Sequence, residues 1–215
     1  EFELKEQTDN RLVFEITSND ESLQNYPYHF RVEIDYELKG KEITITYRVH
    51  NLESDQVMPY FIGGHPAFRC PLLADEDYED YELIFEKEES CSVPLLFTET
   101  GLVDRLQRTP FLDHSRSLPL RHELFEKDAI ILDQLASKSV QLLSKKSGKG
   151  LEFAFADFEN LVLWSTNNKG PFIALEPWTG ISTSAEEGDF FEDKKGVIQL
   201  APQETRSHKY RITIL

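Results

Sequence analysis

The amino-acid sequence predicts an all-β protein, folded as one large antiparallel β-sandwich. Apolar and polar residues alternate with a period of two along much of the chain, and this period is typical of strands with one buried face. Clusters of Gly, Pro, Asn, Asp and Ser separate these runs at short spacing, as they do in sandwiches and barrels. No segment has the 3.6-residue period of a long amphipathic helix.

The clearest single element is a β-hairpin in the first quarter of the chain. Residues 30–38 carry apolar side chains at even positions and charged side chains at odd positions. Residues 43–49 continue the alternation, and Lys39-Gly40 supplies the turn between the two runs. A helix would distribute these apolar residues around its whole circumference, so the pattern favours two paired strands.

The remaining expected strands are shorter runs of the same kind. They are residues 12–16, 57–62, 81–85, 93–97, 140–143, 151–155, 161–164, 172–175, 197–200 and 210–214. Short helical turns are expected at residues 21–26 and 124–127. The 215 residues contain no repeat and no low-complexity linker, which predicts a single domain over residues 1–215.

The composition excludes several classes of protein. The 39 acidic and 23 basic residues give a formal net charge of −16, the opposite of the basic surface that nucleic-acid binding needs. No apolar run approaches the ~20 residues of a membrane helix. Cys70 and Cys91 are too few for a disulfide framework or a four-cysteine zinc site. We expect a cytoplasmic protein with reduced thiols, whose partner is neither a nucleic acid nor a membrane.

Among six histidines, His65 has the context that points most clearly to function. It follows Gly63-Gly64, which permit close backbone approach, and it precedes Pro66, which biases it towards an extended conformation. The imidazole is therefore expected on a stiff turn at a strand end, with a structural or merely exposed role as the alternative. His50 and His208 lie among polar residues and are expected at the surface. No histidine pair has the spacing of metal ligands.

Two carboxylates stand beside apolar runs. Glu176 ends the run 172–175, where a carboxylate is unfavourable unless it is paired or functional. Burial beside Trp178 would raise the pKa of Glu176 towards the range of a general base. Asp128 comes just before the run 130–132. A strand-end glutamate bonded to backbone amides and a turn or capping aspartate are the alternatives. With aromatic neighbours, these residue types suit a sugar site.

Three motifs in this order resemble the aldose 1-epimerases, or galactose mutarotases. They are GGHPAFRCPL (Gly63–Leu72), KDAIIL (Lys127–Leu132) and ALEPWTG (Ala174–Gly180). The LacX-type branch is the most similar, and the resemblance covers essentially all 215 residues. It implies a large antiparallel β-sandwich that binds a sugar across a concave sheet. It also implies interconversion of the α and β anomers of an aldohexose, with no metal and no organic cofactor.

The resemblance also implies residue roles. The family's glutamate, here Glu176, takes the proton from the C1 hydroxyl, and its histidine, here His65, donates one to the ring oxygen. The expected substrate-binding residues are Asp128, Trp178, Phe68 and Arg69. Two alternatives stay open: a catalytically weak sugar-binding or regulatory relative, and a hexose-6-phosphate mutarotase in which Arg69 binds the phosphate. The protein is expected to be a monomer or a homodimer.

The family has a second histidine and an arginine near its pocket, both N-terminal to the HPAF segment. No motif of this sequence matches them. We therefore expect the chain to be the C-terminal two-thirds of the full domain, with about 80–100 further residues in the natural protein. The 215 residues alone are expected to be poorly active and prone to aggregation.

Overall fold

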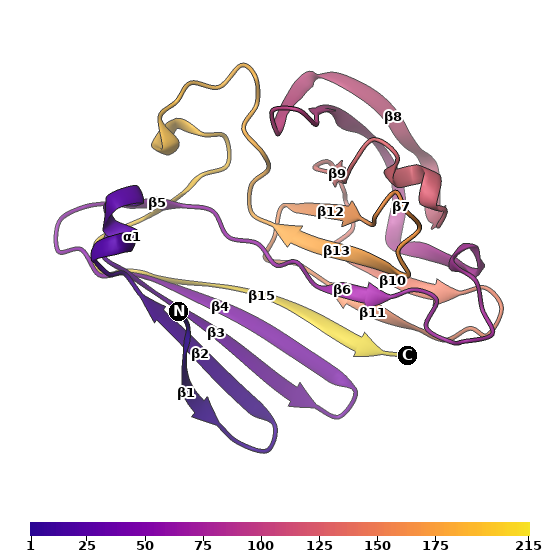
Figure 1. Ribbon diagram of the computed structural model, residues 1–215, viewed down its shortest axis with the longest axis horizontal. Helices are drawn as coiled ribbons and strands as arrows, with labels where there is room; N and C mark the ends of the chain where they lie inside the picture. The colour runs from indigo at the N-terminus through magenta and orange to yellow at the C-terminus, as the bar shows by residue number, and fades with distance from the viewer.

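The computed structural model describes all 215 residues, Glu1–Leu215, and confirms the all-β class (Figure 1). A nine-stranded antiparallel sheet runs in the order β1 (Glu3–Gln7), β2 (Arg11–Thr17), β3 (Phe30–Lys39), β4 (Glu42–Asn51), β15 (Thr205–Ile214), β11 (Gly150–Ala154), β10 (Ser139–Ser144), β7 (Tyr81–Phe97) and β8 (Leu102–Pro119). A four-stranded sheet has the order β6 (Ala67–Arg69), β13 (Phe172–Trp178), β12 (Asn160–Trp164) and β9 (Ile130–Leu132). The remaining pair is β14 (Ile198–Leu200) with β5 (Met58–Tyr60).

Helical structure is limited to four short segments. They are α1 (Asp20–Asn25) and the 3₁₀ turns η1 (Tyr78–Asp80), η2 (His122–Phe125) and η3 (Phe191–Asp193). Asn19 caps α1, because its side chain accepts the amide of Ser22 while the Ser22 hydroxyl accepts the amide of Asn19. No helix of this chain has the length and apolar character needed to cross a membrane.

The main core lies between the four-stranded sheet and the part of the large sheet that contains β15, β11, β10 and β7. Alternation along β13 decides which residues enter it. Ile173 and Leu175 pack in this core. The even-numbered residues of β13, among them Glu176 and Trp178, therefore face the other way. The outer face of the four-stranded sheet is therefore where Glu176 lies.

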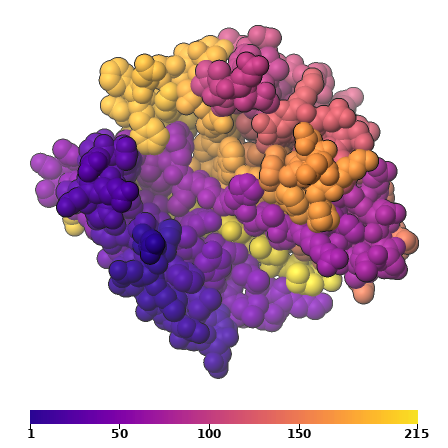
Figure 2. Space-filling view, viewed as in Figure 1, coloured from indigo at the N-terminus to yellow at the C-terminus, as the bar shows by residue number.

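The strands β1–β4 extend away from the four-stranded sheet (Figure 1). One face of them is apolar: Leu12 pairs with Tyr36, and Leu38 pairs with Ile43. These four residues are 36–46% exposed, whereas Ile45 and Tyr47, further along the same face of β4, are buried. In Figure 2 parts of β15, in yellow, are visible between β1–β4 and the rest of the molecule. Part of the large sheet therefore presents an uncovered apolar face.

The predicted hairpin is confirmed as β3 and β4, paired from Phe30 with Asn51 to Lys39 with Glu42. The predicted runs 81–85 and 93–97 belong to one long strand, β7, and its partner β8 was not predicted. Several irregularities interrupt the register between β7 and β8, and β8 is an edge strand, so its residues do not alternate cleanly.

The placement of His208 corrects a prediction. The side chain is 5% exposed, and its Nε2 lies 2.8 Å from the Tyr60 hydroxyl. Its polar sequence neighbours indicated a surface position, but strand alternation turns His208 inward while those neighbours face outward. Burial lowers the pKa of the His208 imidazole. Cys70 and Cys91 are both buried and free.

Candidate active site

The segment before β6 continues the pairing of that strand with β13. Ala67 pairs with Ala174, and Gly63 forms an isolated bridge with Trp178. The same antiparallel register places His65 directly opposite Glu176. Backbone hydrogen bonds join residues 64 and 177 and residues 66 and 175 on either side. His65 and Glu176 are thus a non-hydrogen-bonded pair, the kind whose side chains approach most closely.

Close packing explains the two glycines that precede His65. A Cβ atom on Gly63 would lie 2.7 Å from Cδ1 of Trp178. A Cβ atom on Gly64 would lie 2.9 Å from Cε1 of Tyr210. Both distances are shorter than van der Waals contact, so glycine lets this backbone run close to both aromatic rings. Packing therefore requires glycine at both positions of the motif from which a stiff turn was predicted.

The imidazole and the carboxylate meet across the two strands. His65 Nε2 lies 3.3 Å from Glu176 Oε1. The two side chains differ sharply in exposure, because 60% of the His65 side chain is accessible and only 3% of the Glu176 side chain is. Trp164 packs edge-on against the imidazole, with 5.9 Å between ring centroids. The His65 imidazole is thus held against a buried carboxylate, and much of its surface is open to solvent.

Burial has the largest effect on the pKa of the Glu176 carboxylate. Burial raises the pKa of Glu176, and the neighbouring His65 and Trp178 side chains offset only part of that rise. By contrast, the buried Glu89 carboxylate accepts the backbone amides of Ala136 and Ser137. No backbone amide donates to the Glu176 carboxylate, which is buried on the outer face of the four-stranded sheet. A carboxylate in this state is suited to accept a proton.

A pocket of about 340 Å³ opens over this pair. It is lined by Phe61, Ile62, Gly63, Gly64, His65, Glu176, Trp178, Gly180 and Ile181. The apolar and aromatic walls, with one acid and one imidazole on the floor, match the general composition of a pocket for a small polar ring. The structure therefore brings together three of the predicted site residues: His65, Glu176 and Trp178.

Asp128 lines a neighbouring hollow of about 330 Å³. Trp164 also lines that hollow, and its ring contacts His65, so it stands between the two spaces. The backbone of Asp128 has φ of 129°, which is rare for any residue except glycine, and its carboxylate accepts the amide of Ala129 at 2.7 Å. Backbone strain of this kind often marks a residue with a functional role.

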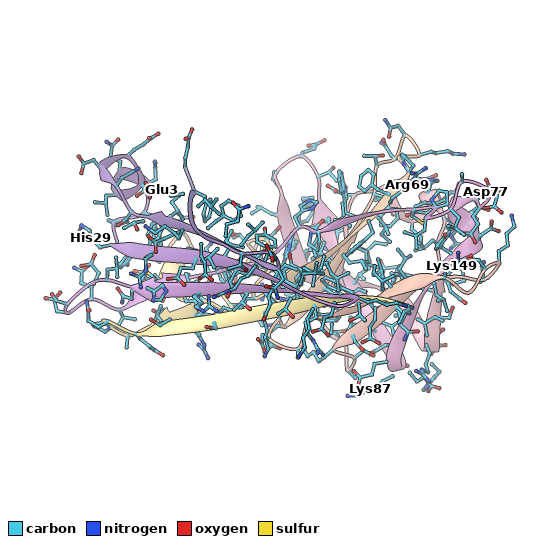
Figure 3. All side chains as sticks on the ribbon, turned by 90° about the horizontal axis from the view of Figure 1, so that it is seen from below. Glu3, His29, Arg69, Asp77, Lys87 and Lys149 are labelled. Atoms are coloured by element: carbon cyan, nitrogen blue, oxygen red, sulfur yellow. The ribbon has the colours of Figure 1, made fainter.

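The other two predicted contacts lie outside the pocket. Phe68 is on the opposite face of the sheet from Glu176, because it is an odd number of residues from His65, and its ring packs edge-on against Phe153 in the core. Arg69, labelled in Figure 3, shares the His65 face and is exposed. It is four residues further along, roughly 13 Å of strand. Neither residue lines the His65–Glu176 pocket.

Several residues of the site were not predicted. Trp164 ends the predicted run 161–164, and its alternation with the core residues Leu161 and Leu163 was the available signal for an outward-facing ring. Phe61 and Thr179 carried no such signal, since their places depend on the pairing of distant segments. The structure has no group of three or more His, Cys, Asp or Glu side chains placed to hold a metal ion.

Comparisons with known proteins identify the family of this chain. The sequence pattern of the aldose 1-epimerase family matches residues 1–213. The chain is 55% identical to the chromosomal and the plasmid-encoded LacX proteins of Lactococcus lactis subsp. lactis, over 100% of this chain and 72% of each relative.

Solved structures have the same fold. A galactose mutarotase related enzyme from Lactobacillus acidophilus superposes with a TM-score of 0.90 and 25% identity, over 100% of this chain and 71% of the relative. A galactose mutarotase-like protein from Lactobacillus casei superposes with a TM-score of 0.86 and 25% identity, over 100% of this chain and 73% of the relative. A putative aldose 1-epimerase from Escherichia coli, 15% identical over 100% of this chain and 68% of the relative, has the same fold with a TM-score of 0.73.

Proposed function

This chain belongs to the aldose 1-epimerase family, and we propose that it interconverts the α and β anomers of an aldohexose by reversible ring opening. The observation that carries the proposal is the pairing of the desolvated Glu176 carboxylate with the His65 imidazole at 3.3 Å on the pocket floor. Trp178 supplies an apolar surface for the C–H face of the sugar ring.

The spacing of the two groups suits the bond that must break. The C1 hydroxyl and the ring oxygen are both attached to C1, so an acid and a base that act on them must be neighbours. Glu176 takes the proton of the C1 hydroxyl, and the electron pair of that O–H bond forms the C1=O1 double bond of the aldehyde. The C1–O5 bond breaks, and its electron pair moves to O5. His65 donates its proton to O5. Rotation of the aldehyde and the reverse proton transfers then close the ring as the other anomer.

Magnetisation exchange between the anomeric protons of galactose and glucose, measured by NMR, tests the proposal. The expected result is exchange faster than in buffer, and loss of at least about 100-fold in Glu176→Gln, the low end for removing a general base. His65→Ala should lower the rate and weaken sugar binding. Glu89→Gln removes another buried carboxylate outside the pocket and should leave the rate unchanged.

The alternatives are outcomes of the same experiment. Sugar binding without faster anomer exchange would favour the catalytically weak relative. Faster exchange of hexose 6-phosphates, lost selectively in Arg69→Ala, would favour the phosphorylated substrate. Exchange at the buffer rate with no sugar binding, by a folded protein, would contradict the proposal.

A further inference from the structure

The ladder that aligns His65 with Glu176 is weaker than an ordinary pair of strands. Pro66 and Pro177 sit in positions where a regular ladder would use their amide hydrogens, and proline has none. The backbone bonds that remain are Gly64 N to Pro177 O at 3.0 Å and Leu175 N to Pro66 O at 3.1 Å. Two prolines therefore remove the return bonds on both sides of the catalytic pair.

Thr179 makes three hydrogen bonds to Ile62 at the next position of this ladder. Its amide donates to Ile62 O at 3.0 Å. Its hydroxyl accepts the amide of Ile62 at 3.0 Å and donates to the same residue's carbonyl oxygen at 3.0 Å. The side chain is almost completely buried, and Thr179 is 6% exposed. One residue thus satisfies both backbone groups of Ile62.

Two glycines form the whole segment between this contact and the imidazole. Only Gly63 and Gly64 separate Ile62 from His65, and glycine restricts the backbone least of all residues. On its N-terminal side, the register of His65 is fixed by the Gly64 bond to Pro177 O and by the contacts of Ile62 with Thr179. The distance that this register sets is the 3.3 Å between His65 Nε2 and Glu176 Oε1.

We propose that Thr179 is a positioning residue: its hydroxyl fixes Ile62 and thereby holds the His65 imidazole against Glu176. The inference rests on the proposed anomer interconversion, since it assigns the pair a catalytic use. Thr179 does not line the His65–Glu176 pocket, so its effect is on the alignment of the acid and the base.

The test compares Thr179→Val, which keeps the shape and removes the hydroxyl, with Thr179→Ser, which keeps the hydroxyl. Thr179→Val should lower kcat about 10–100-fold with a smaller change in KM, because misplacement of about 1 Å costs this much. Thr179→Ser should restore kcat. Ser115→Ala is the matched control, because the Ser115 hydroxyl makes the same pair of bonds to the amide and carbonyl of Ser117, on β8. It should leave kcat unchanged.

Hydrogen exchange of the Gly64 amide gives a readout that does not depend on activity. Its bond to Pro177 O should open more often in Thr179→Val, with exchange about fivefold faster or more, and stay protected in Thr179→Ser and Ser115→Ala. If the wild-type protein does not interconvert anomers, the proposed function fails, while Gly64 exchange still tests the role of Thr179.

Three outcomes would overturn the inference. One is wild-type kcat and wild-type Gly64 protection in Thr179→Val. Another is an equal loss of kcat in Thr179→Val and Ser115→Ala, which would indicate a general loss of protein stability and not a misaligned His65. If Thr179→Val does not fold, loss of Gly64 protection in a folded Thr179→Ser would overturn it instead.

Discussion

Glu176 and Asp35 are both buried carboxylates, and their surroundings move their pKa values in opposite directions. Asp35 accepts hydrogen bonds from the guanidinium groups of Arg11 and Arg48, which lower the pKa of its carboxyl. Burial dominates at Glu176 and raises the pKa. The arginines stabilise the charged form of Asp35. Burial of Glu176 favours its protonated form, and the charged form lowers the stability of the folded protein.

We expect Glu176→Gln to be more stable than the wild-type protein at neutral pH. The folded wild type holds this proton more tightly than the unfolded chain does, because burial raises the pKa of Glu176. Its contribution to stability is therefore complete below the unfolded pKa and disappears as the pH rises through the folded pKa. The advantage of the variant should grow over that interval. Urea unfolding at several pH values measures it, and an advantage independent of pH would contradict the prediction.

At the scale of elements, β2, β3 and β4 separate charge from apolar surface. Their apolar residues share one face, with the exception of Val13. The Arg11–Asp35–Arg48 group lies on the other face, where Val13 pairs with Asp35, and its N–O distances are 2.8–2.9 Å. Each of the three side chains comes from a different strand, so the group ties the three strands together. Alternation with a period of two is sufficient to produce this separation.

Asp35→Asn should lower the free energy of unfolding at pH 7 by about 1–2 kcal/mol, since charged hydrogen bonds are lost but both arginines remain partly solvated. Asp35 has a lowered pKa, so its contribution is present above its unfolded pKa and is lost as the pH falls through the folded one. Glu37→Gln, on the same face of β3 but exposed, is the control. Denaturant titration at pH 7 and pH 3 tests both, and equal effects of the two substitutions would count against the prediction.

At the scale of the whole molecule, the two sheets cover each other only in part. The four-stranded sheet closes the core over β15, β11, β10 and β7, and the apolar face of β1–β4 carries Leu12, Tyr36, Leu38 and Ile43 at the surface. Contiguous exposed apolar surface of this kind is uncommon in monomeric soluble proteins and promotes association. The net charge of −16 acts against that association by repulsion.

We expect the chain of 215 residues to bind a hydrophobic dye and to self-associate through this face. The triple variant Leu12→Thr, Tyr36→Thr and Leu38→Thr should lower dye fluorescence and delay aggregation, because threonine keeps β-propensity while it removes apolar area. The matched control places threonine at Glu15, Glu33 and Glu37 on the opposite face. Light scattering and dye fluorescence measure both, and equal behaviour of the two triple variants would rule out this face as the cause.

The expected longer domain, the cytoplasmic location and the oligomeric state stay predictions. Intact-mass measurement of the native protein checks the first of them.

Strand prediction succeeded for the almost wholly buried β12 and β13, whose apolar runs are continuous. It succeeded most clearly where one face of a strand is buried and the other is solvated. That condition holds for β3 and β4, and their alternation identified both strands and the turn between them. It fails for β8, whose register is irregular and whose edge position leaves its residues without a consistent inner face. The three-residue strands β6 and β9 were not predicted, whereas β5 and β14, equally short, lie within the predicted runs 57–62 and 197–200.

The sequence by itself determined the all-β class and the hairpin and indicated His65, Glu176 and Trp178 as site candidates, because local alternation and short motifs carry that information. Only the tertiary structure decided that His65 faces Glu176 at 3.3 Å, since residues 111 positions apart meet through a register that neither segment encodes alone. The same pairing placed Phe68 in the core and Thr179 beneath the site. Pairing between distant strands sets these positions, and a one-residue shift of register would reverse every one of them.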